Sequence, residues 1–145
     1  IGAGMADPGR TALSIVALKS NFETIEGADD LSNEYASADI ALCAFGVTAY
    51  ELGFFGVPAL YLGLTPDHVL AASAFDAAGM GRSLGLAESV PDETIAASVA
   101  GLVADTLGRR EMRNAGLATI DGNGAARIAA DLAHALARNP FKAAL

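Results

Sequence analysis

The sequence has little of what marks several classes of protein. Of its 145 residues one is a cysteine, none is a tryptophan, and nine are basic against 17 acidic. A single cysteine, Cys43, cannot form an internal disulfide, so we expect a cytoplasmic protein. The formal charge of −8 disfavours binding to nucleic acid or to an anionic membrane, because both require a basic surface.

Long hydrophobic runs and metal-ligand spacings are also missing. Although 52% of the residues are hydrophobic, none of the runs reaches the roughly 18 apolar residues of a membrane span. Two histidines and one cysteine, far apart in sequence, give no metal-ligand spacing, and we expect neither metal nor cofactor. The N-terminus lacks the basic and apolar regions of a signal peptide. The chain starts at Ile1 rather than Met, and we expect it to be part of a longer protein.

What the sequence does have is an alternation of short apolar runs and helical patterns. Residues 40–44 and 59–62 are continuously apolar, which is typical of strands buried on both faces. Further short strands are predicted at 21–26 and 82–84. Helices are predicted at 31–37, 48–55, 66–78, 91–107, 111–118 and 125–138. The alternation predicts one α/β domain over residues 1–145, a Rossmann-like parallel sheet flanked by helices, with the last helices packed across the sheet.

The glycines Gly2 and Gly4 form part of a dinucleotide-binding motif. They stand where an expected strand turns into a helix that starts at Asp7. The complete fingerprint needs a third small residue three positions after the second glycine, and that position holds Asp7. The pattern therefore favours a plain strand-to-helix turn, with a nicotinamide or flavin site as the less favoured alternative.

The segment 44–51 is open to two interpretations. The strand ends at Ala44 and a helix starts near Thr48, so free backbone N–H groups there suit a phosphate. Glu51 lies about one turn further on the same face, where its carboxylate can accept both hydroxyls of a ribose. The pair Thr48 and Glu51 also fits a capping box, in which the side chains satisfy helix-end donors. Spacing alone favours the capping box.

The order of several motifs is more specific than that spacing. Ala-Asp at 38–39 is followed by Gly-x-Thr-x-x-Glu at 46–51, by Gly-x-Pro at 56–58 and by a Gly-rich turn at 121–127. Over residues 1–138 the chain resembles the C-terminal nucleotide-sugar-binding domain of GT-B glycosyltransferases. Within them it is most similar to the group of the UDP-sugar hydrolase of pseudaminic acid synthesis and the spore-coat polysaccharide protein. The enzyme that adds N-acetylglucosamine to the lipid-linked peptidoglycan precursor is a more distant relative.

This resemblance implies that UDP or a UDP-sugar is the ligand. It implies that Gly46, Val47 and Thr48 lie against the diphosphate. It further implies that Glu51 holds the ribose diol. The same residues that spacing alone assigns to a helix cap thus become candidates for a nucleotide site.

Two further loops enter the site through the same resemblance. Gly27 and Ala28 would meet the uracil through backbone groups, and Leu31 would pack beside it. Asp67 and His68 stand where the family usually has Asn-Gln facing the sugar and the phosphates. The expected site therefore combines residues from three loops.

The chain departs from the family pattern in this site. The hydrolases read Gly-Gly-Ser-Thr where this chain has Phe45, Gly46, Val47 and Thr48, and Asp67 replaces an amide by a negative charge. These departures support an alternative, a non-catalytic binding or assembly module that keeps the fold without the chemistry.

The resemblance also implies what lies outside this chain. The family's first strand, its Gly-rich phosphate loop and its N-terminal lobe, which carries a catalytic histidine in the hydrolases, would precede Ile1. The chain would then be the nucleotide-sugar-binding half of a glycosyltransferase or UDP-sugar hydrolase in surface polysaccharide synthesis. Its partner would be that N-terminal lobe, and no catalytic residue is assigned here.

Overall fold

The computed structural model describes residues 23–25 and 27–138. The chain divides into two compact units, Ile1–Glu34 and Tyr35–Leu145. The predicted turn at Gly2 and Gly4 and the helix after it lie outside the described residues.

In the first unit, the strand predicted at 21–26 is wrong for the part that the structure describes, because residues 23–25 are not in a strand. The short helix predicted after it is confirmed as α2 (Ser32–Ser37), which crosses the boundary between the units, so that Tyr35 belongs to the second unit. The carboxylate of Asp30 accepts hydrogen bonds from the backbone N–H and the hydroxyl of Ser32, at 2.9 and 2.6 Å. Asp30 therefore stabilises the start of α2.

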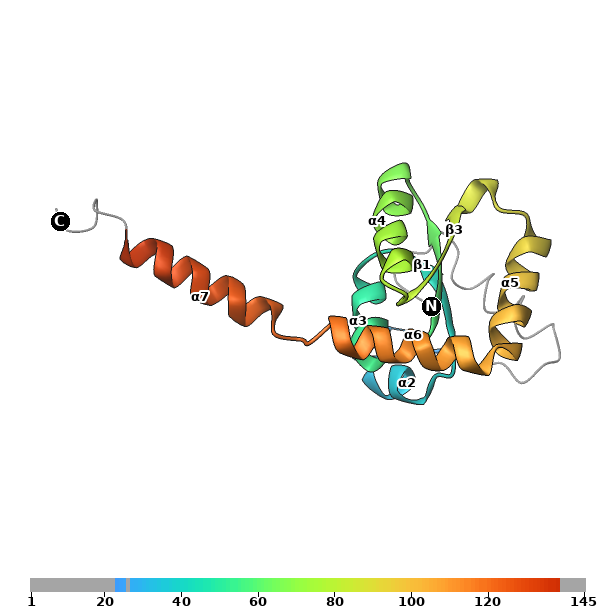
Figure 1. The fold of residues 1–145 in the computed structure, drawn as a ribbon, viewed down its shortest axis with the longest axis horizontal. Coiled ribbons are helices and arrows are strands. Elements are labelled where there is room, and N and C mark those ends of the chain that lie inside the picture. Colours follow the sequence, from blue (N-terminus) through green and yellow to red (C-terminus); the bar gives the residue numbers. More distant parts are fainter. Residues whose placement is uncertain (1–22, 26, 139–145) are drawn as a thin grey trace. The chain divides into compact units, whose positions relative to one another are not determined.

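The second unit contains a parallel sheet with the strand order β1-β2-β3. Its elements are β1 (Ala41–Ala44), α3 (Val47–Phe55), β2 (Ala59–Gly63), α4 (Pro66–Ala77), β3 (Gly81–Leu86), a 3-10 turn (Ala87–Ser89), α5 (Asp92–Ala104), α6 (Thr106–Thr119) and α7 (Gly124–Ala137). Helices α3 and α4 lie on one side of the strands and α5 lies on the other (Figure 1). The predicted fold class, a Rossmann-like parallel sheet flanked by helices, is confirmed.

The core lies on both faces of the central strand β2, because successive side chains of a strand point to opposite faces. Ala59 and Tyr61 are fully buried against α3 and α4. Leu60 points the other way and is buried with Leu102 of α5 and Met112 of α6. The continuous apolar run of β2 is therefore explained by burial on both faces of the strand, as the sequence predicts.

Strand β1 has the same apolar pattern but a different burial. It is the edge strand of the described sheet, and Leu42 is 45% exposed. The prediction that this strand is buried on both faces is wrong. Leu60 and Leu102 pack together over β2, and Leu42 is not part of their cluster.

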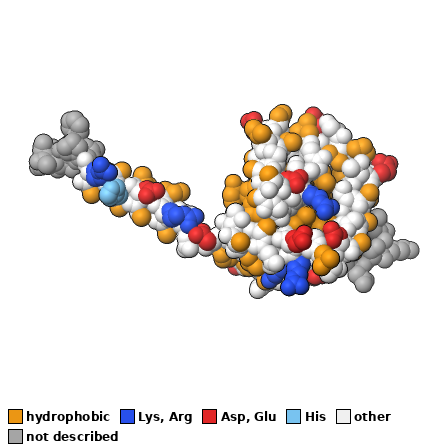
Figure 2. Space-filling view, in the orientation of Figure 1, with side chains coloured by type: hydrophobic (Ala, Val, Ile, Leu, Met, Phe, Trp, Pro, Cys, Tyr) orange, Lys and Arg blue, Asp and Glu red, His pale blue; other side chains and the backbone are white. Residues whose placement is uncertain are grey.

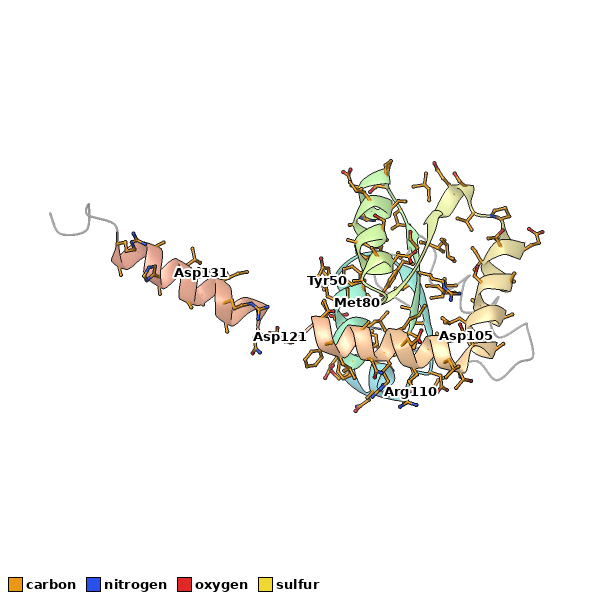
Figure 3. All side chains as sticks on the ribbon, viewed as in Figure 1. Tyr50, Met80, Asp105, Arg110, Asp121 and Asp131 are labelled. Carbon is orange, nitrogen blue, oxygen red and sulfur yellow. The ribbon has the colours of Figure 1, made fainter. Side chains whose placement is uncertain are left out.

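The long helix predicted at 91–107 is in fact broken at Asp105, where α5 ends and α6 begins (Figure 3). The Asp105 carboxylate accepts a hydrogen bond from the Gly108 N–H at 2.8 Å and caps α6. The guanidinium of Arg109 donates to the carbonyl of Leu102 at 2.8 Å, at the end of α5. A polar cap therefore fixes where α5 ends and α6 begins. Hydrophobic periodicity does not reveal such a break.

The last two helices differ in how they pack. Helix α6 packs closely on α3, since a Cβ on Gly116 would lie 2.7 Å from the Gly53 carbonyl oxygen. Helix α7 has no buried residue, and hydrophobic side chains show on its surface (Figure 2). Among them, Ile128, Leu132 and Leu136 are exposed. The prediction that the last helices pack across the sheet is therefore wrong for α7.

Candidate functional site

Two strand-to-helix loops end at the same edge of the sheet. The loop after β1 leads into α3 and the loop after β2 leads into α4. Because β1 and β2 are parallel neighbours, both helices start at the carboxyl edge, where ligands bind in such folds. The Phe45 N–H donates to the Leu62 carbonyl at 2.8 Å and ties the loop after β1 to the end of β2.

The start of α3 carries no side-chain cap. Its N-cap residue is Gly46, and no side chain in the described ranges accepts a hydrogen bond there. Thr48 is already the second residue of the helix, so the capping-box interpretation of Thr48 and Glu51 is wrong. A Cβ added to Gly46 would meet nothing within 4 Å, and the Val47 side chain is 76% exposed. The Gly46 Cα therefore faces open space and the start of α3 has no competing side-chain cap, as an anion site requires.

Glu51 lies one turn into α3 and is held by a residue that the sequence patterns did not identify. The Tyr35 hydroxyl donates to the Glu51 carboxylate oxygen Oε2 at 3.0 Å. Burial raises the pKa of Tyr35, and the bond to Glu51 raises it further. Tyr35 stands 16 residues before Glu51, so only the tertiary structure brings the two together.

The first N–H groups of α4 are capped or removed by residues of the helix start itself. The Thr65 hydroxyl accepts a hydrogen bond from the His68 N–H at 3.3 Å, and Pro66 takes the first helical position. Asp67 is exposed in the first turn. The imidazole Nδ1 of His68 is buried, and it has no hydrogen-bond partner within the described part of the chain.

Aromatic side chains form the floor beneath the two loops. Phe45 is 6% exposed and packs edge-on against Tyr61 and Phe75, with ring centroids 5.4 and 5.1 Å apart. Tyr50 lies on the outside of the same cluster, 4.9 Å from Phe75 (Figure 3). Phe45, which stands where the hydrolases that the chain resembles have a glycine, is thus directed into the core.

The sole cysteine of the sequence lies in β1 and behaves as a packing residue. Cys43 is partly buried, and burial raises the pKa of its thiol to about 11. The reactive thiolate is therefore scarce at neutral pH.

The residues predicted to meet the uracil belong to the first unit. Gly27 has a φ of +60°, and both Gly27 and Ala28 are exposed. Leu31 is half-buried and precedes α2. Their role beside a base stays a prediction.

The Gly-rich turn before α7 holds its own ion pair. The Arg127 guanidinium donates to the Asp121 carboxylate at 2.6 Å and draws the pKa of Asp121 down to about 2. A cavity of about 410 Å³ beside this turn is lined by residues that include Tyr50, Ile120 and Gly122. The charge of Arg127 is therefore compensated within the turn.

Two further kinds of feature are absent from the described part of the chain. Among residues 23–25 and 27–138, no three His, Cys, Asp or Glu side chains are grouped closely enough to hold a metal ion. None of the helices in these ranges has the length and hydropathy needed to cross a bilayer.

Comparison with known proteins gives one informative similarity, although no protein-family model matches the chain. The sequence is 31% identical, over 130 residues, to the spore coat polysaccharide biosynthesis protein SpsG of Bacillus subtilis. The aligned region is 89% of this chain and 38% of that protein. The chain is thus similar, over most of its own length, to the smaller part of a spore coat polysaccharide biosynthesis protein.

Proposed function

We propose that this chain is the nucleotide-sugar-binding part of an enzyme of surface polysaccharide synthesis and that UDP, free or in a UDP-sugar, binds at the start of α3. The observation that carries the proposal is the uncapped helix start at Gly46 with the Glu51 carboxylate one turn further on. Backbone N–H groups suit the oxygens of a diphosphate, and a carboxylate accepts the hydroxyls of a ribose.

The charge of the chain makes this local geometry decisive. A formal charge of −8 repels a diphosphate at long range. Affinity must then come from short-range donors, and the open space at Gly46 lets a phosphate oxygen approach the first N–H groups of α3. The similarity to a polysaccharide biosynthesis protein and the resemblance to GT-B C-terminal domains support the same ligand.

The reaction that we propose for the whole enzyme is hydrolysis or transfer at the bond between sugar and nucleotide. In this proposal the chain binds the nucleotide and an N-terminal lobe in the cytoplasm supplies the catalytic groups. The chain by itself then binds UDP without turning over a UDP-sugar.

One observation favours the alternative of a non-catalytic module. Asp67 is exposed in the first turn of α4, beside the proposed diphosphate site, and Val47 offers no hydroxyl there. A module that had lost its ligand would tolerate both residues. The two functions differ in whether UDP binds at all.

Calorimetric titration of the chain with UDP separates these functions. We expect the wild-type chain to bind, and Glu51→Ala to weaken binding by roughly tenfold to a hundredfold, because charge-assisted hydrogen bonds are lost. Glu111→Ala removes an exposed carboxylate of α6 and is the matched control, with unchanged affinity expected. Absence of heat and of NMR shifts at millimolar UDP would refute the proposal and favour the non-catalytic module.

A further inference from the structure

One hydrogen bond connects Tyr35 of α2 to the proposed ribose-binding carboxylate. The Tyr35 hydroxyl has one proton, and it donates this proton to Glu51 Oε2 at 3.0 Å. Tyr35 is thus the donor and Glu51 the acceptor, so an ionised carboxylate keeps this bond.

This arrangement leaves the carboxylate free for a ligand with two donors. An ionised carboxylate has about four acceptor positions on its two oxygens, and Tyr35 occupies one of them. Both positions on Oε1 and one on Oε2 stay available. Two adjacent hydroxyls, such as those of a ribose, can therefore bind Glu51 while the bond from Tyr35 is kept.

Tyr35 is itself held in place by packing. Its ring lies against Phe55 of α3, with centroids 5.7 Å apart and planes inclined by 52°. The Tyr35 hydroxyl is thus a fixed point beside a long and flexible glutamate side chain. A glutamate that is already ordered loses less rotamer freedom when a ligand binds.

We propose that Tyr35 is a positioning residue that fixes the Glu51 carboxylate for a vicinal diol and so makes the site select ribonucleotides over 2′-deoxyribonucleotides. The inference rests on the proposed UDP site. It assigns to Tyr35 an effect on sugar selectivity, which a residue that only stabilised the fold would not have.

The test compares UDP with 2′-deoxy-UDP in calorimetric titrations of the wild-type chain and two matched variants. Tyr35→Phe keeps the ring against Phe55 and removes only the hydroxyl, whereas Tyr50→Phe removes the hydroxyl of an exposed tyrosine on α3. We expect the wild type to prefer UDP, and Tyr35→Phe to lose roughly tenfold in UDP affinity with a smaller loss for 2′-deoxy-UDP. Tyr50→Phe should match the wild type with both ligands.

The outcomes separate this inference from the proposed function. If the wild-type chain binds UDP and Tyr35→Phe keeps the wild-type preference for UDP over 2′-deoxy-UDP, the positioning role is wrong and the UDP site stands. If the wild-type chain does not bind UDP, both are wrong. Addition of Tyr35→Phe to Glu51→Ala should cause no further loss, because the hydroxyl acts only through the carboxylate.

Discussion

The two helices that start at the carboxyl edge of the sheet differ in how their first N–H groups are used. Helix α3 starts at Gly46 without a side-chain cap, whereas α4 starts at Thr65, whose hydroxyl accepts the His68 N–H. Pro66 removes a further donor from α4, and Asp67 adds a negative charge. The two loops have the same topology, but they differ in their capacity to bind an anion. The start of α3 is the better place for one.

The largest expected difference in stability is between alanine substitutions at the glycines that precede α3 and α4. A Cβ on Gly63, at the end of β2, would overlap the Val69 side chain and lie 3.0 Å from the Val69 backbone nitrogen, whereas a Cβ on Gly46 meets open space. We expect Gly63→Ala to lower the free energy of unfolding by about 2–3 kcal/mol in urea denaturation. Gly46→Ala should change it by less than about 0.5 kcal/mol.

The same glycine pair also separates folding from binding. Because the open space at Gly46 is where the diphosphate is proposed to lie, Gly46→Ala should weaken UDP binding in a fully folded protein. Equal destabilisation by the two alanines would contradict the difference between the loops.

The two threonines give a contrast of intermediate size. Thr65 is a true N-cap, so Thr65→Ala should cost about 1 kcal/mol of unfolding free energy. Thr48 is inside α3 and caps nothing, so Thr48→Ala should cost less than about 0.5 kcal/mol in the same urea denaturation. A larger loss for Thr48→Ala than for Thr65→Ala would restore the capping-box interpretation of α3.

The elements around these loops could be predicted because each has a local signal. The apolar run of β2, the helix from Pro66 and the left-handed Gly56 that ends α3 all follow from composition and turn chemistry. The break at Asp105 could not be predicted, because an aspartate within an apolar pattern can equally lie inside a helix or cap a new one. The exposure of Leu42 could not either, since it depends on what covers the neighbouring strand.

The candidate site was predictable to a similar extent. Topology alone places Gly46 and Asp67 at one edge of the sheet, as the pattern of strands and helices predicts. Spacing could not decide whether Thr48 is the cap, because one residue of difference in the helix start reverses its role. The bond from Tyr35 to Glu51 has no sequence signal, since it joins two helices across 16 positions.

The smallest expected effect concerns Asp67, whose substitution should raise the affinity for UDP and lower the stability of the fold. Asp67→Asn removes a negative charge beside the proposed diphosphate, so UDP affinity should rise by roughly two- to fivefold at low salt and by less at high salt. The same change should lower the free energy of unfolding by about 0.3–1 kcal/mol, because a carboxylate in the first turn interacts favourably with the helix dipole.

Asp92→Asn is the matched control for Asp67→Asn, since Asp92 is exposed in the first turn of α5. It should lower stability by a similar amount and leave UDP affinity unchanged, which calorimetry and urea denaturation of both variants can measure. If Asp67→Asn also left UDP affinity unchanged, the ligand would lie away from α4. Binding would then depend on the start of α3 alone, and the contrast between the two helix starts would be sharper still.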